Sequence, residues 1–263
     1  MGCALLSQPG NAGIALAFVC AARGYPLLLV MPETMSLERR ALLLLLGAEI
    51  VLTQGGSGMK GAIAKAKELL ESSSDFFVLN QLDNPSSPDI HRETTALEIW
   101  RDTDGQVDFV VTSIGTDGMA TGIGEVLKAK KPSIKIVGIE PEEPAVISGE
   151  KPEPHKIQGI GAGFIPKNLN VNILDQVKKV TRSKSVEMAR RLIKEKGIPA
   201  GISSGTAVVV ALRIAAKEEN RKKVIVTIIP SYIERYLSTV LAEKEREEAV
   251  HLPVSSVDEK YLS

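Results

Sequence analysis

The sequence predicts an α/β protein built on parallel sheets, and three observations lead to this class. Short apolar runs alternate along the chain with segments of helical periodicity, which is the order of a βαβ fold. The runs are apolar at nearly every position, as strands covered by helices on both faces require. The chain has 263 residues, of which 44% are hydrophobic and 24% charged, enough for one large unit or two small lobes with a real core.

The elements follow one another in a regular order. Apolar runs predict strands at residues 26–31, 49–53, 76–79, 108–112, 134–139 and 223–229, and residues 4–6 offer at most one very short strand before them. Between the runs, the spacing of apolar residues predicts helices at residues 13–23, 35–47, 59–72, 91–103, 118–130, 184–196, 204–217 and 232–246.

Two stretches have no such pattern. Residues 141–170 are rich in proline and glycine, and we expect them to run over the surface or to line a cleft. Residues 243–263 are rich in charge, which predicts a solvated helix end followed by disorder.

Composition argues against several classes of function. Lys plus Arg and Asp plus Glu total 32 each, so net charge gives no reason to expect nucleic acid or an anionic membrane as a partner. Two cysteines are too few for a disulfide scaffold or a zinc site made of cysteines alone, and no pair of histidines has metal-ligand spacing. No run of 18 apolar residues predicts a membrane span, so the expected location is the cytoplasm.

The strongest candidate site is the loop IGTDGMATG at residues 114–122, which follows a predicted strand and opens a predicted helix. Glycines let backbone N–H groups face a ligand, and a helix N-terminus favours an anion such as phosphate. The glycine spacing is neither a Walker A loop nor a dinucleotide fingerprint, so a tight turn with glycines for packing is the alternative. Asp117 would repel a phosphate bound there.

Three further positions have the chemistry of caps or site residues. Asn11, in the sequence GNAG, caps a helix or presents its amide to a ligand, and capping is the simpler interpretation. Ser203 and Ser204 precede a predicted helix and are interpreted as N-caps. Ser231 follows the last predicted strand, at the carboxyl edge of the sheet where α/β proteins form their sites.

Seven ordered motifs resemble those of the cysteine synthase (O-acetylserine thiol-lyase) family, and the resemblance extends from about Leu5 to about Leu241. It implies the two-lobe parallel-sheet fold of the tryptophan-synthase-β-like (fold type II) enzymes that use pyridoxal phosphate (PLP), a homodimer, and the synthesis of cysteine and acetate from O-acetylserine and sulfide. We expect an N-terminal lobe over residues 1–84, a C-terminal lobe with the phosphate loop over residues 85–242, and a charged tail over residues 243–263. The motifs are MPETMSLERR (31–40), GMKGA (58–62), NPSSPDIH (84–91), EIWRD (98–102), HKIQGIGAGFIP (155–166), GISSG (201–205) and ERYLST (234–239).

The resemblance also implies which residues face the substrate. The family's loop Thr-Ser-Gly-Asn-Thr falls on residues 8–12, where Asn11 is kept and would face the 3′ oxygen of PLP. Three hydroxyl groups that would hold the substrate carboxylate are replaced, by Gln8, Pro9 and Ala12. Gln81 matches a glutamine that contacts the substrate.

The family's phosphate cup, Gly-Thr-Gly-Gly-Thr, falls on residues 115–119. Gly115, Thr116 and Gly118 are kept, whereas Asp117 replaces a glycine and Met119 replaces a threonine. The resemblance therefore implies a cup that has kept part of its backbone pattern but has lost one hydroxyl and gained one carboxyl group.

Ser231 matches the serine that bonds the pyridine nitrogen of PLP, but the family's Schiff-base lysine would lie upstream of Met1. The resemblance thus implies no catalytic residue here, an incomplete and loosely structured N-terminal lobe, and weak or lost PLP binding. The predicted function is an inactive cysteine synthase homologue. The alternatives are a fragment of a working enzyme, or a non-catalytic protein that binds serine acetyltransferase or an active paralogue.

Overall fold

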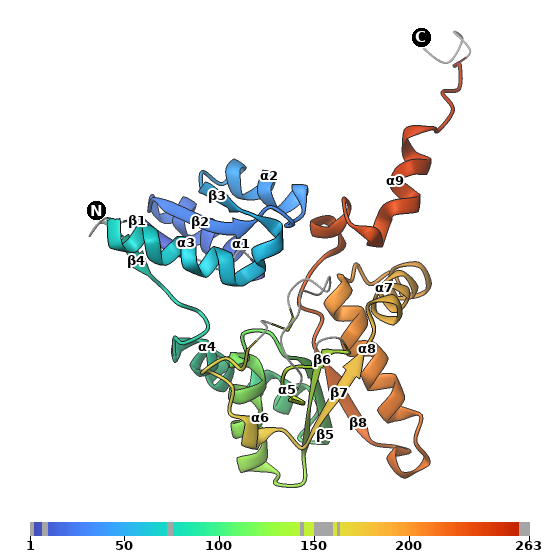
Figure 1. The fold of residues 1–263 in the computed structure, drawn as a ribbon. Helices are drawn as coiled ribbons and strands as arrows, with labels where there is room; N and C mark the ends of the chain where they lie inside the picture. The colour runs from blue at the N-terminus through green and yellow to red at the C-terminus, as the bar shows by residue number, and fades with distance from the viewer. Residues whose placement is uncertain are drawn as a thin grey trace.

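The computed structural model describes residues 10–72, 76–142, 145–149, 160–161 and 164–257, together with the backbone of residues 3–6. These residues form two sheets of four parallel strands each. Figure 1 shows the sheets in two layered units, which we call the N-lobe (β1–β4 with α1–α3) and the C-lobe (β5–β8 with α4–α8). The last strand of the N-lobe ends at Val78 and the first helix of the C-lobe begins at Ser86. The domain boundaries at residues 84 and 242 stay a prediction.

The N-lobe sheet has the strand order β3-β2-β1-β4. Its central strand β2 is buried at all six positions because helices cover both faces. Leu29 and Met31 pack with α1 and α2, whereas Leu28 and Val30 point to the opposite face and pack with α3. The bounds are β1 (Cys3–Leu6), α1 (Asn11–Arg23), β2 (Leu27–Pro32), α2 (Leu37–Leu45), β3 (Glu49–Thr53), α3 (Gly58–Ser72) and β4 (Phe76–Val78).

The C-lobe sheet has the strand order β7-β6-β5-β8. Side chains of α5 and α6 cover one face, those of α8 cover the other, and α7 packs on α8. The bounds are α4 (Ser86–Ile90), α5 (Ala96–Asp102), β5 (Val107–Ser113), α6 (Gly118–Lys130), β6 (Lys135–Pro141), β7 (Gln176–Val180), α7 (Arg182–Lys196), α8 (Ile202–Ala215), β8 (Val224–Thr227) and α9 (Glu243–Val250).

A close helix contact places α4 against the start of α6. A Cβ atom on Gly122 would lie 2.3 Å from the carbonyl oxygen of Pro88, so only glycine fits at this crossing. The chain continues from α4 through a π-helical turn, His91–Thr95, into α5. The helix predicted at residues 91–103 is therefore part of a longer helical segment that begins at Ser86.

The two lobes meet where residues 230–239, which we call the junction segment, pass beside α2 (Figure 1). Ser36 Oγ donates a hydrogen bond of 2.7 Å to the carbonyl oxygen of Arg235. Ser238 Oγ donates one of 2.6 Å to Glu38 Oε2 and accepts one of 3.3 Å from Leu37 N. Polar groups from the two ends of the sequence thus hold the lobes together.

Most predicted elements are confirmed, and the helix at residues 118–130 is found with the predicted bounds. The helix predicted at residues 232–246 is wrong. Tyr232 forms an antiparallel bridge with Ala200, and two short 3-10 turns, Ile233–Tyr236 and Val240–Ala242, precede α9. Thr239 interrupts the segment because its side chain accepts a hydrogen bond from Leu241 N and caps the second turn.

Strand β7 was not predicted. It lies at the edge of the C-lobe sheet and carries Gln176, Lys178 and Lys179, so its sequence is not an apolar run.

Within the described residues, no helix combines the length and apolar composition needed to cross a membrane. Nor do the described His, Cys, Asp and Glu side chains form a group that could hold a metal ion.

Candidate cofactor site

The loop predicted to bind phosphate connects the end of β5 to the start of α6, as the sequence indicates. Asp117 occupies the N-cap position of α6 with a left-handed backbone, φ +66°. A glycine adopts this conformation without strain, and the resemblance places a glycine here. Aspartate is among the few other residues that tolerate it, so the loop keeps its shape although the side chain has changed.

The carboxyl group of Asp117 folds back into this loop. Its Oδ1 accepts a hydrogen bond of 3.0 Å from Gly115 N, one of the N–H groups that would face a phosphate. Its Oδ2 is buried and has no hydrogen-bond partner, and the residue is only 4% exposed. Burial raises the pKa of the Asp117 carboxyl to about 7, and the hydrogen bond from Gly115 opposes this rise only in part.

The other cup residues are where the resemblance predicts them. Gly118 has no room for a side chain, since a Cβ atom would lie 2.2 Å from Ser87 Oγ and 2.6 Å from the backbone carbon of Ser87. Met119 packs against the apolar cluster between α5, α6 and the sheet, and its sulfur accepts a hydrogen bond of 3.6 Å from Thr112. Thr116 is half-buried. The side chain at position 119 therefore contributes to the core and supplies no hydroxyl to the cup.

Asn11 binds the junction segment. Its Nδ2 donates a hydrogen bond of 3.0 Å to the carbonyl oxygen of Pro230, and its Oδ1 accepts one of 2.7 Å from Arg235 Nη1. The interpretation of Asn11 as a helix cap is wrong, because Gly10 is the N-cap of α1 and no side chain caps that end. Asn11 is the first residue inside the helix, and the junction segment engages both ends of its amide. Ala12 is half-buried in α1, and Gln8 and Pro9 lie outside the described residues.

Ser231 lies beside Asn11, since it follows the residue that Asn11 binds. The hydroxyl group of Ser231 is 3.0 Å from the Tyr236 hydroxyl, and Ser231 is 3% exposed. A Cβ atom on Gly201 would lie 2.4 Å from Ser231 Oγ, so the loop before α8 closes the other side. The guanidinium group of Arg39, from α2, lies 5.7 Å from the centre of the Tyr236 ring.

The structure also places three further residues that the sequence analysis singled out. Gly201 is the N-cap of α8, so Ser203 and Ser204 are not caps but buried residues inside the helix. Gln81 lies in the turn between β4 and α4, where its carbonyl oxygen accepts a hydrogen bond of 2.7 Å from Asn168 Nδ2. Its assigned contact with a substrate stays a prediction.

Sequence reasoning did not assign a role to Arg235, Tyr236 or Arg39, although all three belong to motifs that carry the resemblance. Arg235 binds Asn11, Tyr236 contacts the Ser231 hydroxyl, and Arg39 lies over the Tyr236 ring. The resemblance assigns Asn11 to the 3′ oxygen and Ser231 to the pyridine nitrogen of PLP. The polar motif ERYLST follows the last apolar strand and has no helical spacing, and it is the signal that could have indicated Arg235 and Tyr236.

The described residues do not fit a phosphate at the cup. A phosphate needs the N–H groups of the loop free and no anion beside them, whereas Asp117 occupies the Gly115 N–H and carries a buried carboxyl group. Asn11 and Ser231 also have internal partners. The polar groups that the resemblance assigns to the cofactor thus have partners within the chain.

The comparisons with known proteins identify one family. Residues 2–231 match the family described as pyridoxal-phosphate dependent enzyme. The chain is 57% identical over 242 residues to cysteine synthase of Haemophilus influenzae, covering 89% of this chain and 77% of that protein. It is 53% identical over 241 residues to cysteine synthase A of Escherichia coli K12, covering 88% and 75%.

A solved structure supports the same relationship. The crystal structure of cysteine synthase from Entamoeba histolytica matches with a TM-score of 0.86 and 43% identity, covering 98% of this chain and 73% of that one. The predicted two-lobe fold of the fold type II enzymes is confirmed. The chain therefore belongs to the pyridoxal-phosphate dependent enzyme family, with cysteine synthases among its relatives.

Proposed function

We propose that this chain is a cysteine synthase homologue whose phosphate cup is closed by its own Asp117, so that it binds PLP weakly and does not catalyse the reaction of its relatives. The observation that carries the proposal is the hydrogen bond from Gly115 N to the buried carboxyl group of Asp117. The proposal rests on residues within the chain and holds whatever residues precede Met1.

Both protonation states of Asp117 oppose a phosphate. When the carboxyl group is ionised, a unit charge 4 Å away is repelled by about 4 kcal/mol at an effective dielectric constant near 20. When it is protonated, which its pKa of about 7 allows near neutrality, the carboxyl group still occupies the Gly115 N–H. A bound phosphate would have to displace the side chain in either state.

The partners of Asn11 and Ser231 support the same proposal. A ligand that used the Asn11 amide would have to break its bonds to Pro230 and Arg235, which join the two lobes. A ligand that used the Ser231 hydroxyl would have to compete with Tyr236. Binding at either position therefore works against contacts that stabilise the fold.

Self-association and a place in the cytoplasm are further parts of the proposal. Apolar side chains lie exposed on α1 and α2, and Phe18, Val19, Leu44 and Leu45 are more than half exposed. Such surface favours a second chain, either a copy of this one or an active paralogue. Binding of serine acetyltransferase has no support from a described residue and stays a prediction.

The proposal is tested by PLP binding to wild type and to the double variant Asp117→Gly with Met119→Thr, measured by calorimetry. We expect the double variant to bind PLP at least about tenfold more tightly, because removal of one unit repulsion in a partly buried site is worth more than 1.4 kcal/mol. Pyridoxal, which lacks the phosphate, should bind both proteins equally, so that the gain is assigned to the cup.

Asp104→Gly is the matched control, since Asp104 also has a left-handed backbone (φ +47°) but lies exposed in a turn. This variant should bind PLP as wild type does. Equal PLP affinity of wild type and the double variant would contradict the closed cup. Cysteine formation from O-acetylserine and sulfide by the wild-type chain would contradict the loss of activity.

A further inference from the structure

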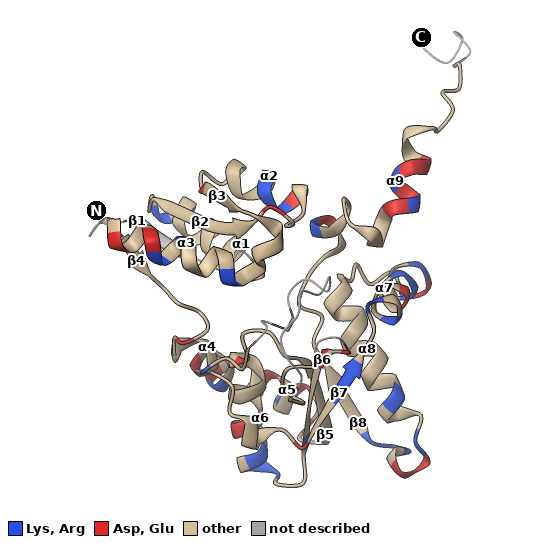
Figure 2. Ribbon diagram, viewed as in Figure 1, with Lys and Arg blue, Asp and Glu red and all other residues tan. Residues whose placement is uncertain are grey.

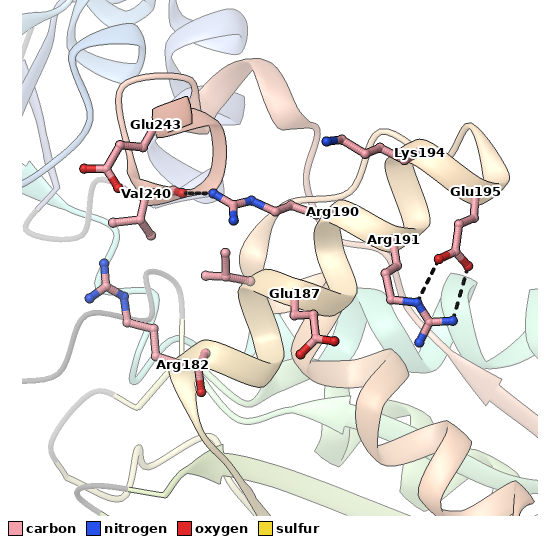
Figure 3. Close-up of a pocket in the computed structure, with 10 residues that line it drawn as sticks. Arg182, Glu187, Arg190, Arg191, Lys194, Glu195, Val240 and Glu243 are labelled. Atoms are coloured by element: carbon pink, nitrogen blue, oxygen red, sulfur yellow. Dashed lines mark hydrogen bonds and ion pairs between the residues drawn. The ribbon is translucent and has the colours of Figure 1, made fainter. Parts of the chain in front are cut away.

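A cavity of about 540 Å³ lies between α7 and the turn at residues 240–243, and none of the residues that line it belongs to the candidate cofactor site (Figure 3). Figure 2 shows that α7 is rich in basic residues. One stripe along this helix consists of residues spaced four apart, namely Arg182, Val186, Arg190 and Lys194. This stripe makes one wall of the cavity, and Val240 and Glu243 lie on the other.

The two walls are fixed to each other. Arg190 donates hydrogen bonds to the carbonyl oxygens of Val240, at 2.7 Å, and Leu241, at 2.9 Å. One turn further along α7, Lys194 Nζ lies 2.9 Å from Glu245 Oε1. These contacts preform the cavity, so a ligand does not have to order it.

The three cations other than Arg182 that line the cavity have partners within the protein. Arg191 is paired with Glu195 through two hydrogen bonds, of 2.9 and 3.2 Å. Arg190 and Lys194 have the partners given above. Arg182 differs, because its Nε is buried without a hydrogen-bond partner and no described carboxylate lies within ion-pair distance of it. Its side chain extends from the first turn of α7 along the cavity wall (Figure 3).

The remaining lining residues define the ligand. Val186 and Val240 supply apolar surface beside Arg182, which suits a short alkyl group. Glu187 and Glu243 also line the cavity, and their negative charges disfavour a ligand that carries several negative charges. We propose that this cavity binds a short-chain aliphatic carboxylate, with the carboxylate on Arg182 and the alkyl group between Val186 and Val240. A guanidinium group binds a carboxylate through two parallel hydrogen bonds, and the positive end of α7 adds to the attraction.

Isovalerate is a suitable probe, and its binding to the full chain is measured by methyl NMR. We expect saturable shifts at the methyl groups of Val186 and Val240. Arg182→Gln should weaken binding by about tenfold or more, since a charge-assisted hydrogen bond is lost. Arg182→Lys keeps the charge without the fork and should retain part of the affinity. Lys184→Gln is the control, because Lys184 is an exposed cation on the same helix that does not line the cavity, and it should bind as wild type does.

Selectivity gives a second, independent test. Inorganic phosphate and citrate should displace isovalerate poorly, and Glu187→Gln should improve their competition because it removes one of the two opposing charges. Equal binding by Arg182→Gln and wild type would overturn the proposal. Methyl shifts at residues other than Val186 and Val240 would overturn it as well. The same holds if phosphate displaced isovalerate as effectively as a second short-chain carboxylate does.

Discussion

The N-lobe and the C-lobe are built from the same kind of βαβ unit, but the N-lobe helix α2 leaves more apolar surface exposed than any helix that covers the C-lobe sheet. In the C-lobe, β6 is buried at all positions except its first. In the N-lobe, no position of β3 is buried, and Phe77 on β4 is 65% exposed. The helices do not account for this difference, because each sheet has side chains of two helices on one face and of one helix on the other: α5 and α6 opposite α8 in the C-lobe, and α1 and α2 opposite α3 in the N-lobe. The burial of an apolar run therefore follows the place of its strand, since β6 lies inside its sheet whereas β3 and β4 lie at the edges of theirs.

The leucine run on α2 shows the difference within a single helix. Leu43 is fully buried, whereas Leu45 is 85% exposed. Because helical geometry turns neighbouring residues to different faces, a continuous apolar run must leave some side chains outside the core unless a second partner covers them. On α8 of the C-lobe the imbalance is smaller, since Val210 is fully buried and Leu212 is 50% exposed, and the stability of this lobe should depend less on a partner.

The largest expected effect distinguishes the lobes by a matched pair of core substitutions. Leu29 on β2 and Ile136 on β6 are both fully buried, and replacement of either by alanine should lower the free energy of unfolding by about 2–5 kcal/mol. In hydrogen exchange, Leu29→Ala should speed exchange mainly at residues 27–78, because the N-lobe has its own core. Ile136→Ala should instead speed exchange across β5, β6 and β8. Equal acceleration in both sheets by Leu29→Ala would show that the lobes unfold as one unit.

The next effect concerns the buried carboxyl group of Asp117, which lies in the C-lobe. Because burial raises the pKa of Asp117 from 3.8 to about 7, the folded chain holds a proton in this range that the unfolded chain has released. The free energy of unfolding should therefore fall as pH rises, by about 1.4 kcal/mol per pH unit, and level off above about 7. Asp117→Asn removes this slope and keeps the hydrogen bond from Gly115, so it should be the more stable protein at pH 8.

The measurement is the difference in unfolding free energy between Asp117→Asn and wild type, by urea denaturation from pH 4.5 to 8. Burial lowers the pKa of His91, so the free energy of unfolding of both proteins also falls toward acid over part of the same pH range. Taking the difference between the two proteins removes this contribution of His91. Asp104→Asn, at an exposed position that also has a left-handed backbone, is the control for the change from aspartate to asparagine itself. A flat difference for Asp117→Asn would mean that its carboxyl group is not buried in solution.

A smaller effect is expected at the contact between the lobes. Asn11→Ala removes two hydrogen bonds that join α1 to the junction segment and leaves Arg235 without this acceptor. The loss should be about 1–3 kcal/mol, and it should appear as faster exchange at residues 230–239 with little change in β5 and β6. Asn172→Ala, at an exposed position of the C-lobe, is the control. If Asn11→Ala left the junction segment protected, the Ser36 and Ser238 bonds alone would hold the lobes together.

The smallest effect tests the uncovered surface itself. Leu45→Lys should change the free energy of unfolding by less than about 0.5 kcal/mol, because the side chain is 85% exposed. It should nevertheless reduce self-association measured by light scattering, since it places a charge in the apolar surface of α2. Leu43→Ala, two residues away and fully buried, should have the opposite pattern, with lost stability and unchanged association. A large stability loss in Leu45→Lys would show that another chain covers this face.

Local pattern determined much of this protein. The strand runs and the helix at residues 118–130 follow from apolar spacing, because burial on one or two faces imposes that spacing on neighbouring residues. The loop between β5 and α6 and the change at Asp117 are also visible in the sequence. The edge strand β7 was missed, since an exposed edge does not require apolar residues and so leaves no such pattern.

Tertiary structure alone decided which polar groups meet. Asn11 and Arg235 are far apart along the chain, and nothing in the spacing of either shows that they form a hydrogen bond of 2.7 Å. The sequence shows a charge at Asp117 but not its 4% exposure, which moves its pKa to about 7. Periodicity is a property of neighbours along the chain, whereas burial and long-range hydrogen bonds depend on what the folded chain brings against a residue from elsewhere.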